Sequence, residues 1–212
     1  MAEVLITLGI IGVVAAMTLP TLIKHYQQQV VLNQVKKFYT EMSQVLQMAK
    51  AIDGDLSGCD RTNSENYYKA CIQPYIKNVD IKYQYPIHLH AVFTSGVKFN
   101  FADGTQAIFS SPGCEQNSYK YPVLIFYTKV HTENSAASRY ISHPTREQFF
   151  FYINEKGYLV PPKSNDTRQN LINGCAEKMN HNNGIDYGSN GHITCSTLIY
   201  NDHWEIKSDY PW

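Results

Sequence analysis

The chain has 212 residues, enough for one long apolar segment followed by a single globular domain. Lys and Arg together number 18, as do Asp and Glu, so the net charge is near zero. This balance argues against a dedicated nucleic-acid surface, which would be markedly basic. The charged fraction is only 17%, a composition that suits a surface protein or an assembly with close neighbours.

The first segment is predicted to be a membrane span. No charged side chain lies between Glu3 and Lys24, and this run has about the length that crosses a bilayer core. A cleaved secretory signal is a weaker alternative, because the run is longer than a usual signal core and no small-x-small cleavage site follows it. The residues that define the predicted span are Val4, Leu5, Ile6, Gly9, Gly12, Leu19 and Ile23.

One carboxylate, Glu3, stands at the start of the span. An acid at the mouth of an apolar helix is costly in lipid, so it is a candidate functional residue. The alternative is a charge that rests at headgroup level.

Residues 2–20, AEVLITLGIIGVVAAMTLP, closely resemble the N-terminal segment of type IV pilins and of type II secretion pseudopilins. Glu3 falls on the family's glutamate, and Gly9, Gly12 and Pro20 keep the family spacing. The resemblance implies that Glu3 and Pro20 serve assembly. It also implies a basic leader that a prepilin peptidase removes before a methylated Phe.

In this sequence Met1 stands where the third mature residue would be, and the family's Phe-Thr pair is absent. Either a leader has been trimmed or the protein is not processed. Lys24, Lys36 and Lys37 follow the span and nothing basic precedes it, an asymmetry that alone would keep the head in the cytoplasm. A basic leader would reverse this orientation, so we expect trimming and an exported head.

The helix is predicted to continue through the first 52 residues. One apolar stripe, with spacings of four and three, indicates a helix face that packs on a core rather than a coiled coil. Asp53 and Gly54 predict its end. The helix therefore divides into a membrane or filament-core half, 1–23, and a half docked on the head, 24–52. The stripe consists of Val31, Val35, Phe38, Met42, Val45, Ala49 and Ile52.

Residues 53–212 are predicted to form the head. The stretch 53–85 is expected to be a loop-rich connector with a short helix over 64–72, which Pro74 stops. Period-two patterns and turn signals then predict four or five antiparallel strands that cover the stripe. The expected strands are 97–101, 106–110, 123–130, 148–153 and 158–160, with hairpin turns at 102–105 and 154–157. The predicted class is thus α+β and pilin-like, with a long N-terminal helix packed on an antiparallel sheet.

Five cysteines lie at positions 59, 71, 114, 175 and 195, without a CxxC motif. In an oxidising compartment, Cys59 with Cys71 and Cys175 with Cys195 are the natural pairs by proximity, which leaves Cys114 over. The alternative is that all five are reduced thiols.

The C-terminal part resembles the same family. The motif Phe-Ala-Asp-Gly-Thr at 101–105 and the final stretch 202–212 are typical of bacterial pilin-like proteins, whose heads commonly carry a cysteine pair before the tryptophan motif. We expect Trp204, Tyr210 and Trp212 to pack the chain end onto the sheet rather than bind a ligand.

Signals for catalysis are weak. The chain has no GxSxG, HExxH, phosphate-loop or GxGxxG motif. His88 and His90 share a strand face, but without a nearby carboxylate they are more typical of exposed surface. The loop with Asn183, Asp186, Ser189 and Asn190 offers one carboxylate, too few to indicate a calcium site. We predict that the protein is not an enzyme and needs no cofactor.

The resemblance therefore implies a filament subunit, a pilin or pseudopilin of a type IV pilus or type II secretion system. Its expected partners are copies of itself or related pilins, an inner-membrane assembly platform and the prepilin peptidase. Its expected location is the bacterial inner membrane, as a single-pass protein with an exported head, and then the pilus or pseudopilus. The alternative is a membrane-tethered or pilus-tip domain for adhesion or DNA uptake on the same scaffold.

Overall fold

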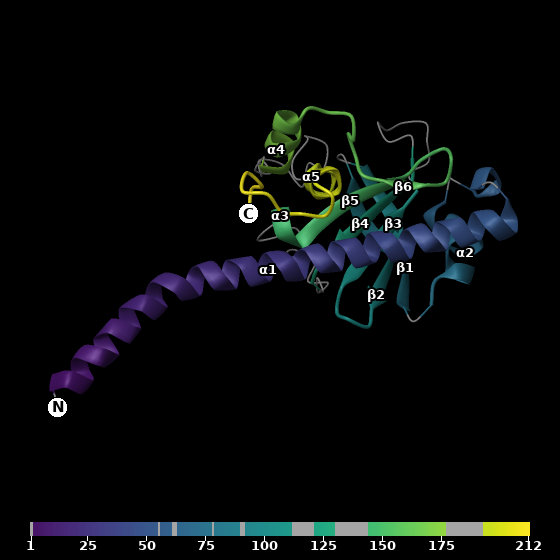
Figure 1. Cartoon of the computed structure of the whole chain (residues 1–212). Coiled ribbons are helices and arrows are strands. Elements are labelled where there is room, and N and C mark those ends of the chain that lie inside the picture. The colour runs from purple at the N-terminus through teal and green to yellow at the C-terminus, as the bar shows by residue number, and fades with distance from the viewer. Residues whose placement is uncertain are drawn as a thin grey trace.

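The computed structural model describes residues 2–54, 56–60, 63–77, 79–89, 92–111, 121–129, 144–176 and 193–212. A single long helix, α1 (Ala2–Asp53), projects from a head built on a six-stranded sheet (Figure 1). At about 1.5 Å per residue, α1 is about 78 Å long. The α+β class and the long N-terminal helix are thus confirmed.

The sheet is an antiparallel meander in which each strand pairs with its neighbours in the sequence. Its strands are β1 (Val79–Leu89), β2 (Val92–Phe101), β3 (Gln106–Ser110), β4 (Val123–Tyr127), β5 (Gln148–Ile153) and β6 (Leu159–Val160). The strands predicted at 106–110 and 148–153 are confirmed to the residue, whereas β4 ends at Tyr127, earlier than predicted.

Two corrections concern the sheet. It has six strands, not four or five, and β1 lies partly inside the stretch that was predicted to be a connector. Ile81, Tyr83 and Tyr85 do alternate with polar residues, but Gln84 has a positive φ of 55° and the register with β2 shifts between Lys82 and Tyr85. A bulge of this kind interrupts the alternation on which the sequence argument depends.

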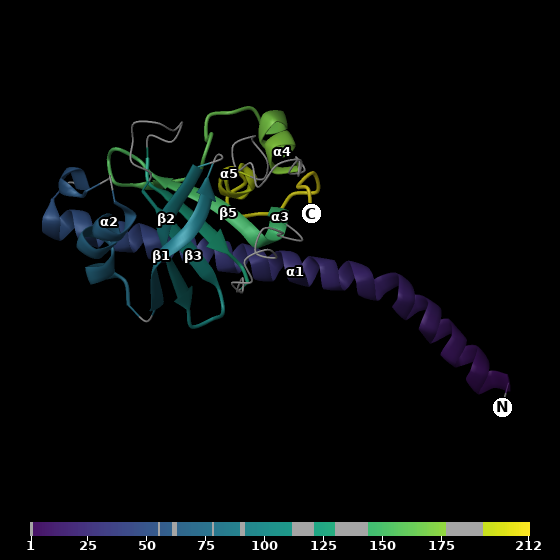
Figure 2. The same cartoon turned by 180° about the vertical axis from the view of Figure 1, so that it is seen from behind.

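The smaller helical elements surround the sheet (Figures 1 and 2). The helix predicted at 64–72 is confirmed as α2, where the Asn63 side chain accepts hydrogen bonds from the N–H groups of Glu65 and Asn66. Helices α4 and α5 pack on each other and were not predicted. The elements are η1 (Leu56–Gly58), α2 (Ser64–Cys71), η2 (Gln73–Tyr75), α3 (Pro144–Glu147), α4 (Arg168–Ala176) and α5 (Cys195–Asn201).

The core lies between α1 and one face of the sheet. Phe38 stacks on Phe126 of β4 with ring centroids 4.4 Å apart, and it also contacts Phe101 and Phe151. Such aromatic pairs contribute about 0.5–1.5 kcal/mol each beyond their buried area. The docked half of α1 is therefore fixed on the sheet by aromatic packing.

Six of the seven stripe positions on α1 are buried, and Ile52 is not: it is 70% exposed. A strict seven-residue repeat drifts by about 20° per heptad relative to a straight helix, so three heptads turn the last position by about 60°. Leu32 and Leu46, which lie off the stripe, are buried instead. The prediction was thus wrong at its last residue, for a geometric reason.

We predict that Phe38→Asp destabilises the head by about 3–5 kcal/mol, because it removes a stacked ring and buries a charge. The effect is measured as the thermal midpoint of residues 25–212, which should themselves form a soluble monomer with one cooperative transition. Ile52→Asp is the matched control, since the same charge enters solvent there. Equal midpoints for the two variants would show that this face of α1 does not hold the head.

Candidate functional site

The N-terminal half of α1 is a bare apolar helix. Every large apolar side chain described between Val4 and Ile23 is at least half exposed, from 51% at Leu19 to 73% at Met17. Apolar surface on this scale marks a membrane or protein interface. By length and composition, this helix is able to cross a membrane.

Two threonines of this half of α1, which we call the arm (residues 2–23), satisfy their hydroxyls within the helix. The hydroxyls of Thr7 and Thr18 donate to the carbonyls of Val4 and Val14, each at 3.0 Å. A hydroxyl bonded within its own helix avoids the cost of an unsatisfied donor in lipid. At Gly9 and Gly12, no atom of the described residues outside the helix backbone lies within 4 Å of the place where a Cβ would stand. The two glycines therefore leave a smooth surface that another helix could approach closely.

The predicted assembly residues lie at the two ends of the arm. Glu3 is exposed in the first turn of α1, where the helix N-terminus favours a negative charge. Pro20 lies inside the helix, and α1 curves along this half (Figure 1). A proline removes one backbone hydrogen bond and bends a helix. Of the predicted span residues, Val4, Ile6, Gly9, Gly12, Leu19 and Ile23 are exposed, and the Leu5 side chain lies outside the described part.

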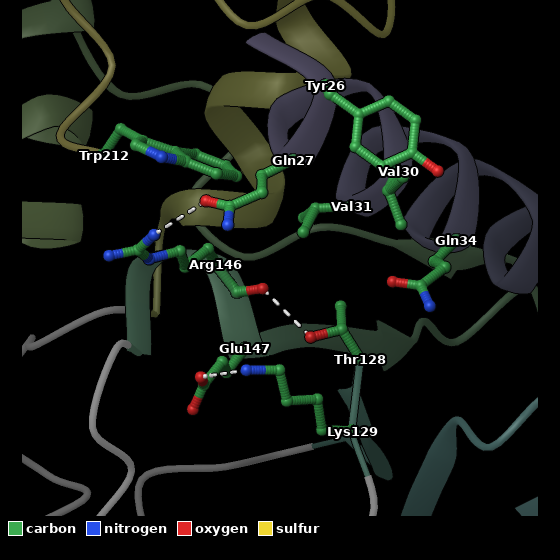
Figure 3. A pocket seen from close by; sticks show the side chains of 10 residues that line it. All are labelled: Tyr26, Gln27, Val30, Val31, Gln34, Thr128, Lys129, Arg146, Glu147 and Trp212. Atoms are coloured by element: carbon green, nitrogen blue, oxygen red, sulfur yellow. Dashed lines mark hydrogen bonds and ion pairs between the residues drawn. The ribbon is translucent and has the colours of Figure 1, made fainter. Parts of the chain in front are cut away.

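A hollow of about 320 Å³ lies where the arm meets the head. Figure 3 shows its walls: α1 on one side, and Trp212 with residues 128–129 and 146–147 on the other. The Arg146 guanidinium lies 5.2 Å from the Trp212 ring centroid, and its Nη1 donates to Gln27 Oε1 at 3.5 Å. Lys129 pairs with the buried Glu147 at 3.0 Å.

The chain end is held by a charged clamp around Arg168 at the start of α4. The guanidinium donates to Asp202 at 2.6 Å and makes a two-pronged contact with Asp209 at 2.8 and 2.6 Å. Burial raises the pKa of the Asp202 carboxyl, but hydrogen bonds from Arg168 and Lys207 outweigh it, so that pKa lies below its ordinary value. The hydrogen bonds from Arg168 likewise lower the pKa of Asp209.

The C-terminal aromatic residues pack against the core that the sheet shares with α1, as expected from the sequence. Trp204 also packs on Tyr39 of α1, with centroids 5.0 Å apart, and on Tyr200 of α5. The Tyr210 hydroxyl donates to the Thr145 carbonyl, and Trp212 lies over Arg146. The final segment therefore ties the head to α1 and α3.

The hairpin turn predicted in the Phe-Ala-Asp-Gly-Thr motif is confirmed, and the structure adds a contact to α1 that the sequence did not predict. One carboxylate oxygen of Asp103 accepts hydrogen bonds from the N–H and hydroxyl of Thr105, and the other accepts from Lys37 of α1 at 2.7 Å. Gly104 takes a positive φ of 81°, which a side chain would strain. The β2–β3 turn is thus pinned to the docked half of α1.

Two disulfides are present, Cys59–Cys71 and Cys175–Cys195, with Cα atoms 6.3 and 4.7 Å apart. These are the pairs expected from the sequence, and Cys114 lies outside the described residues. The first links the residue that follows η1 to α2, and the second links α4 to α5.

No group of three metal-ligating side chains occurs among the described residues. The side chains of His88 and His90, and the whole loop from Asn183 to Asn190, lie outside that part of the chain. The described residues form three candidate sites: the apolar arm, the hollow between the arm and the head (the junction hollow), and the clamp around Arg168.

Residues 21–212 match DUF6613, a family of unknown function, and the chain belongs to this family. The match covers the docked half of α1 and the whole head. Neither the curated proteins nor the solved structures contain a significant match to the chain.

We predict that non-reducing peptide mapping of protein from native cells recovers a linked 175/195 fragment. The two disulfides join residues that are 12 and 20 positions apart. Replacing both cysteines of either pair by alanine should therefore lower the free energy of unfolding by about 3 kcal/mol. Ser208→Ala, on the exposed surface of the head, is the control. Five free thiols would contradict both pairs and an oxidising compartment.

We predict that Arg168→Ala lowers the thermal midpoint by about 5 °C or more, because the buried Asp202 loses its main cation. The folded-state pKa of Asp202 lies below the unfolded value, so its contribution is full above about pH 4 and is lost as pH falls through the folded pKa. The midpoint of the variant should therefore depend less on pH between 5 and 3. Lys36→Ala, on exposed α1 surface, should retain the parent profile, and a parent-like profile for Arg168→Ala would contradict the clamp.

Proposed function

We propose that the chain is a pilin-like filament subunit, a pilin or pseudopilin of a type IV pilus or type II secretion system. The proposal rests on the difference in burial between the two halves of α1. Its first half buries none of its described side chains, while its second half is fixed on an antiparallel sheet. A helix of this kind has one half available for lipid or for the helices of other copies.

The sequence resemblance of residues 2–20 supplies the class of assembly. In such a filament, the arms of many copies pack together and the heads form the outer surface. The subunit waits in the inner membrane with its head exported, after a prepilin peptidase has removed a leader, and an assembly platform then transfers it to the filament.

Glu3 is assigned a pairing role in this assembly. Once the arm leaves the membrane, the carboxylate meets the N-terminal amine of a neighbouring copy within an apolar filament core. Opposite charges attract strongly there, and a charge left unpaired is costly. The helix termini of the copies are thereby set in register.

We predict that Glu3→Ala, made in the full-length precursor, leaves membrane insertion intact and reduces incorporation into filaments at least tenfold. Insertion is measured by resistance to alkaline extraction, and incorporation by recovery of tagged subunit in sheared filaments that also contain the parent. Glu205→Ala, an exposed acid on the head, is the control. Normal incorporation of Glu3→Ala would refute the pairing role, while loss of Glu205→Ala from filaments would point to the head surface instead.

A further inference from the structure

The junction hollow is bounded by two aromatic side chains and by basic groups, and it lies just beyond the apolar run. Tyr26 is three residues past Ile23, or about 5 Å along the helix, and Gln27 is about 6 Å past it. The headgroup layer on each side of a bilayer core is about 5–8 Å thick. If Ile23 marks the edge of the hydrocarbon core, the mouth of the hollow lies at headgroup depth.

The side chains of the hollow have the chemistry of that layer. Tyr26 is 69% exposed, and Trp212 lies partly buried on the opposite side of the hollow (Figure 3); both residue types concentrate at membrane interfaces. Arg146 presents a planar guanidinium, which suits a phosphate oxygen pair. The Lys129 side chain is 70% exposed, and its partner Glu147 is only 6% exposed, so the cation is the member of the pair that faces outward.

The figures place this end of the head toward the arm. Helix α3 and the C-terminal segment lie nearest the point where α1 leaves the head, and α2 lies at the opposite end (Figures 1 and 2). Exposed Lys24 and His25 continue the basic and polar belt along α1. This end of the head therefore meets the membrane surface whenever the arm is inserted.

We propose that the junction hollow holds the headgroup of an anionic phospholipid from the bilayer that the same chain crosses, with its phosphate at Arg146 and its glycerol between Tyr26 and Trp212. This inference rests on the proposed membrane-inserted subunit and adds a lipid partner to it. The bound lipid seats the head on the membrane surface and fixes its tilt relative to the arm. Departure into a filament would then require release of the lipid.

The test uses the full chain in nanodiscs, with Trp204→Phe so that Trp212 is the one remaining tryptophan. Discs of phosphatidylcholine contain either brominated phosphatidylglycerol or brominated phosphatidylcholine at the same fraction, and bromine quenches nearby tryptophan emission. We expect Trp212 to be quenched, with phosphatidylglycerol enriched around it by about fivefold, the effect of one basic residue at an anionic surface. Arg146→Gln should abolish that enrichment, and Lys77→Gln, which removes a charge at the distal end of the head, should retain it.

A second reporter separates this proposal from the one on which it rests. In a chain with Trp204→Phe, Trp212→Phe and Leu8→Trp, quenching reports insertion of the arm. Quenching of this reporter without quenching of Trp212 overturns the lipid site alone, and failure of both overturns the membrane assignment as well. Equal quenching of Trp212 by the two brominated lipids overturns the preference for an anionic headgroup. Protection of Trp212 only in discs that hold two chains would assign the hollow to a neighbouring copy and also overturn the proposal.

Discussion

The architecture depends on the packing of one helix face against one sheet face. Phe38 stands at the centre of that contact, among rings from β2, β4 and β5. Further links between α1 and the head are added around it, among them Lys37 to the β2–β3 turn, Tyr39 to Trp204, and Lys50 to the carbonyl of Lys156. Because this contact uses only the second half of α1, the first half is left without a partner in the described part of the chain.

The same contact determines what the sequence could reveal. Long periodic patterns in the sequence predicted the structure correctly. The helix, the strands at 106–110 and 148–153, and the burial of six of the seven stripe positions follow from residue spacing alone. Patterns fail where local geometry departs from the ideal period. The bulge at Gln84 interrupts the alternation of β1, so this strand was not predicted. The drift of a seven-residue repeat around the helix turns Ile52 toward solvent.

The candidate sites were predictable to a lesser degree, because they join residues far apart in the chain. The apolar arm is contiguous, so Glu3 and Pro20 were found directly. The hollow unites residues from α1, the segment after β4, α3 and the C-terminal end, and the clamp joins Arg168 to Asp202 and Asp209. No spacing rule connects such positions, and only the folded chain brings their charges together.

The sequential order of the sheet has a consequence for folding of the newly made chain. Each strand pairs with the one made just before it, so hairpins can close early and locally. The stripe on α1 is made first, yet two of its aromatic partners, Phe126 and Phe151, belong to β4 and β5, roughly a hundred residues later. During synthesis the helix therefore presents two uncovered apolar surfaces in tandem, one that no described part of the head covers and one that the sheet covers later. Exposed apolar surface of this kind is where nascent chains aggregate, so the order of synthesis leaves both halves of α1 open to self-association until β4 and β5 are made.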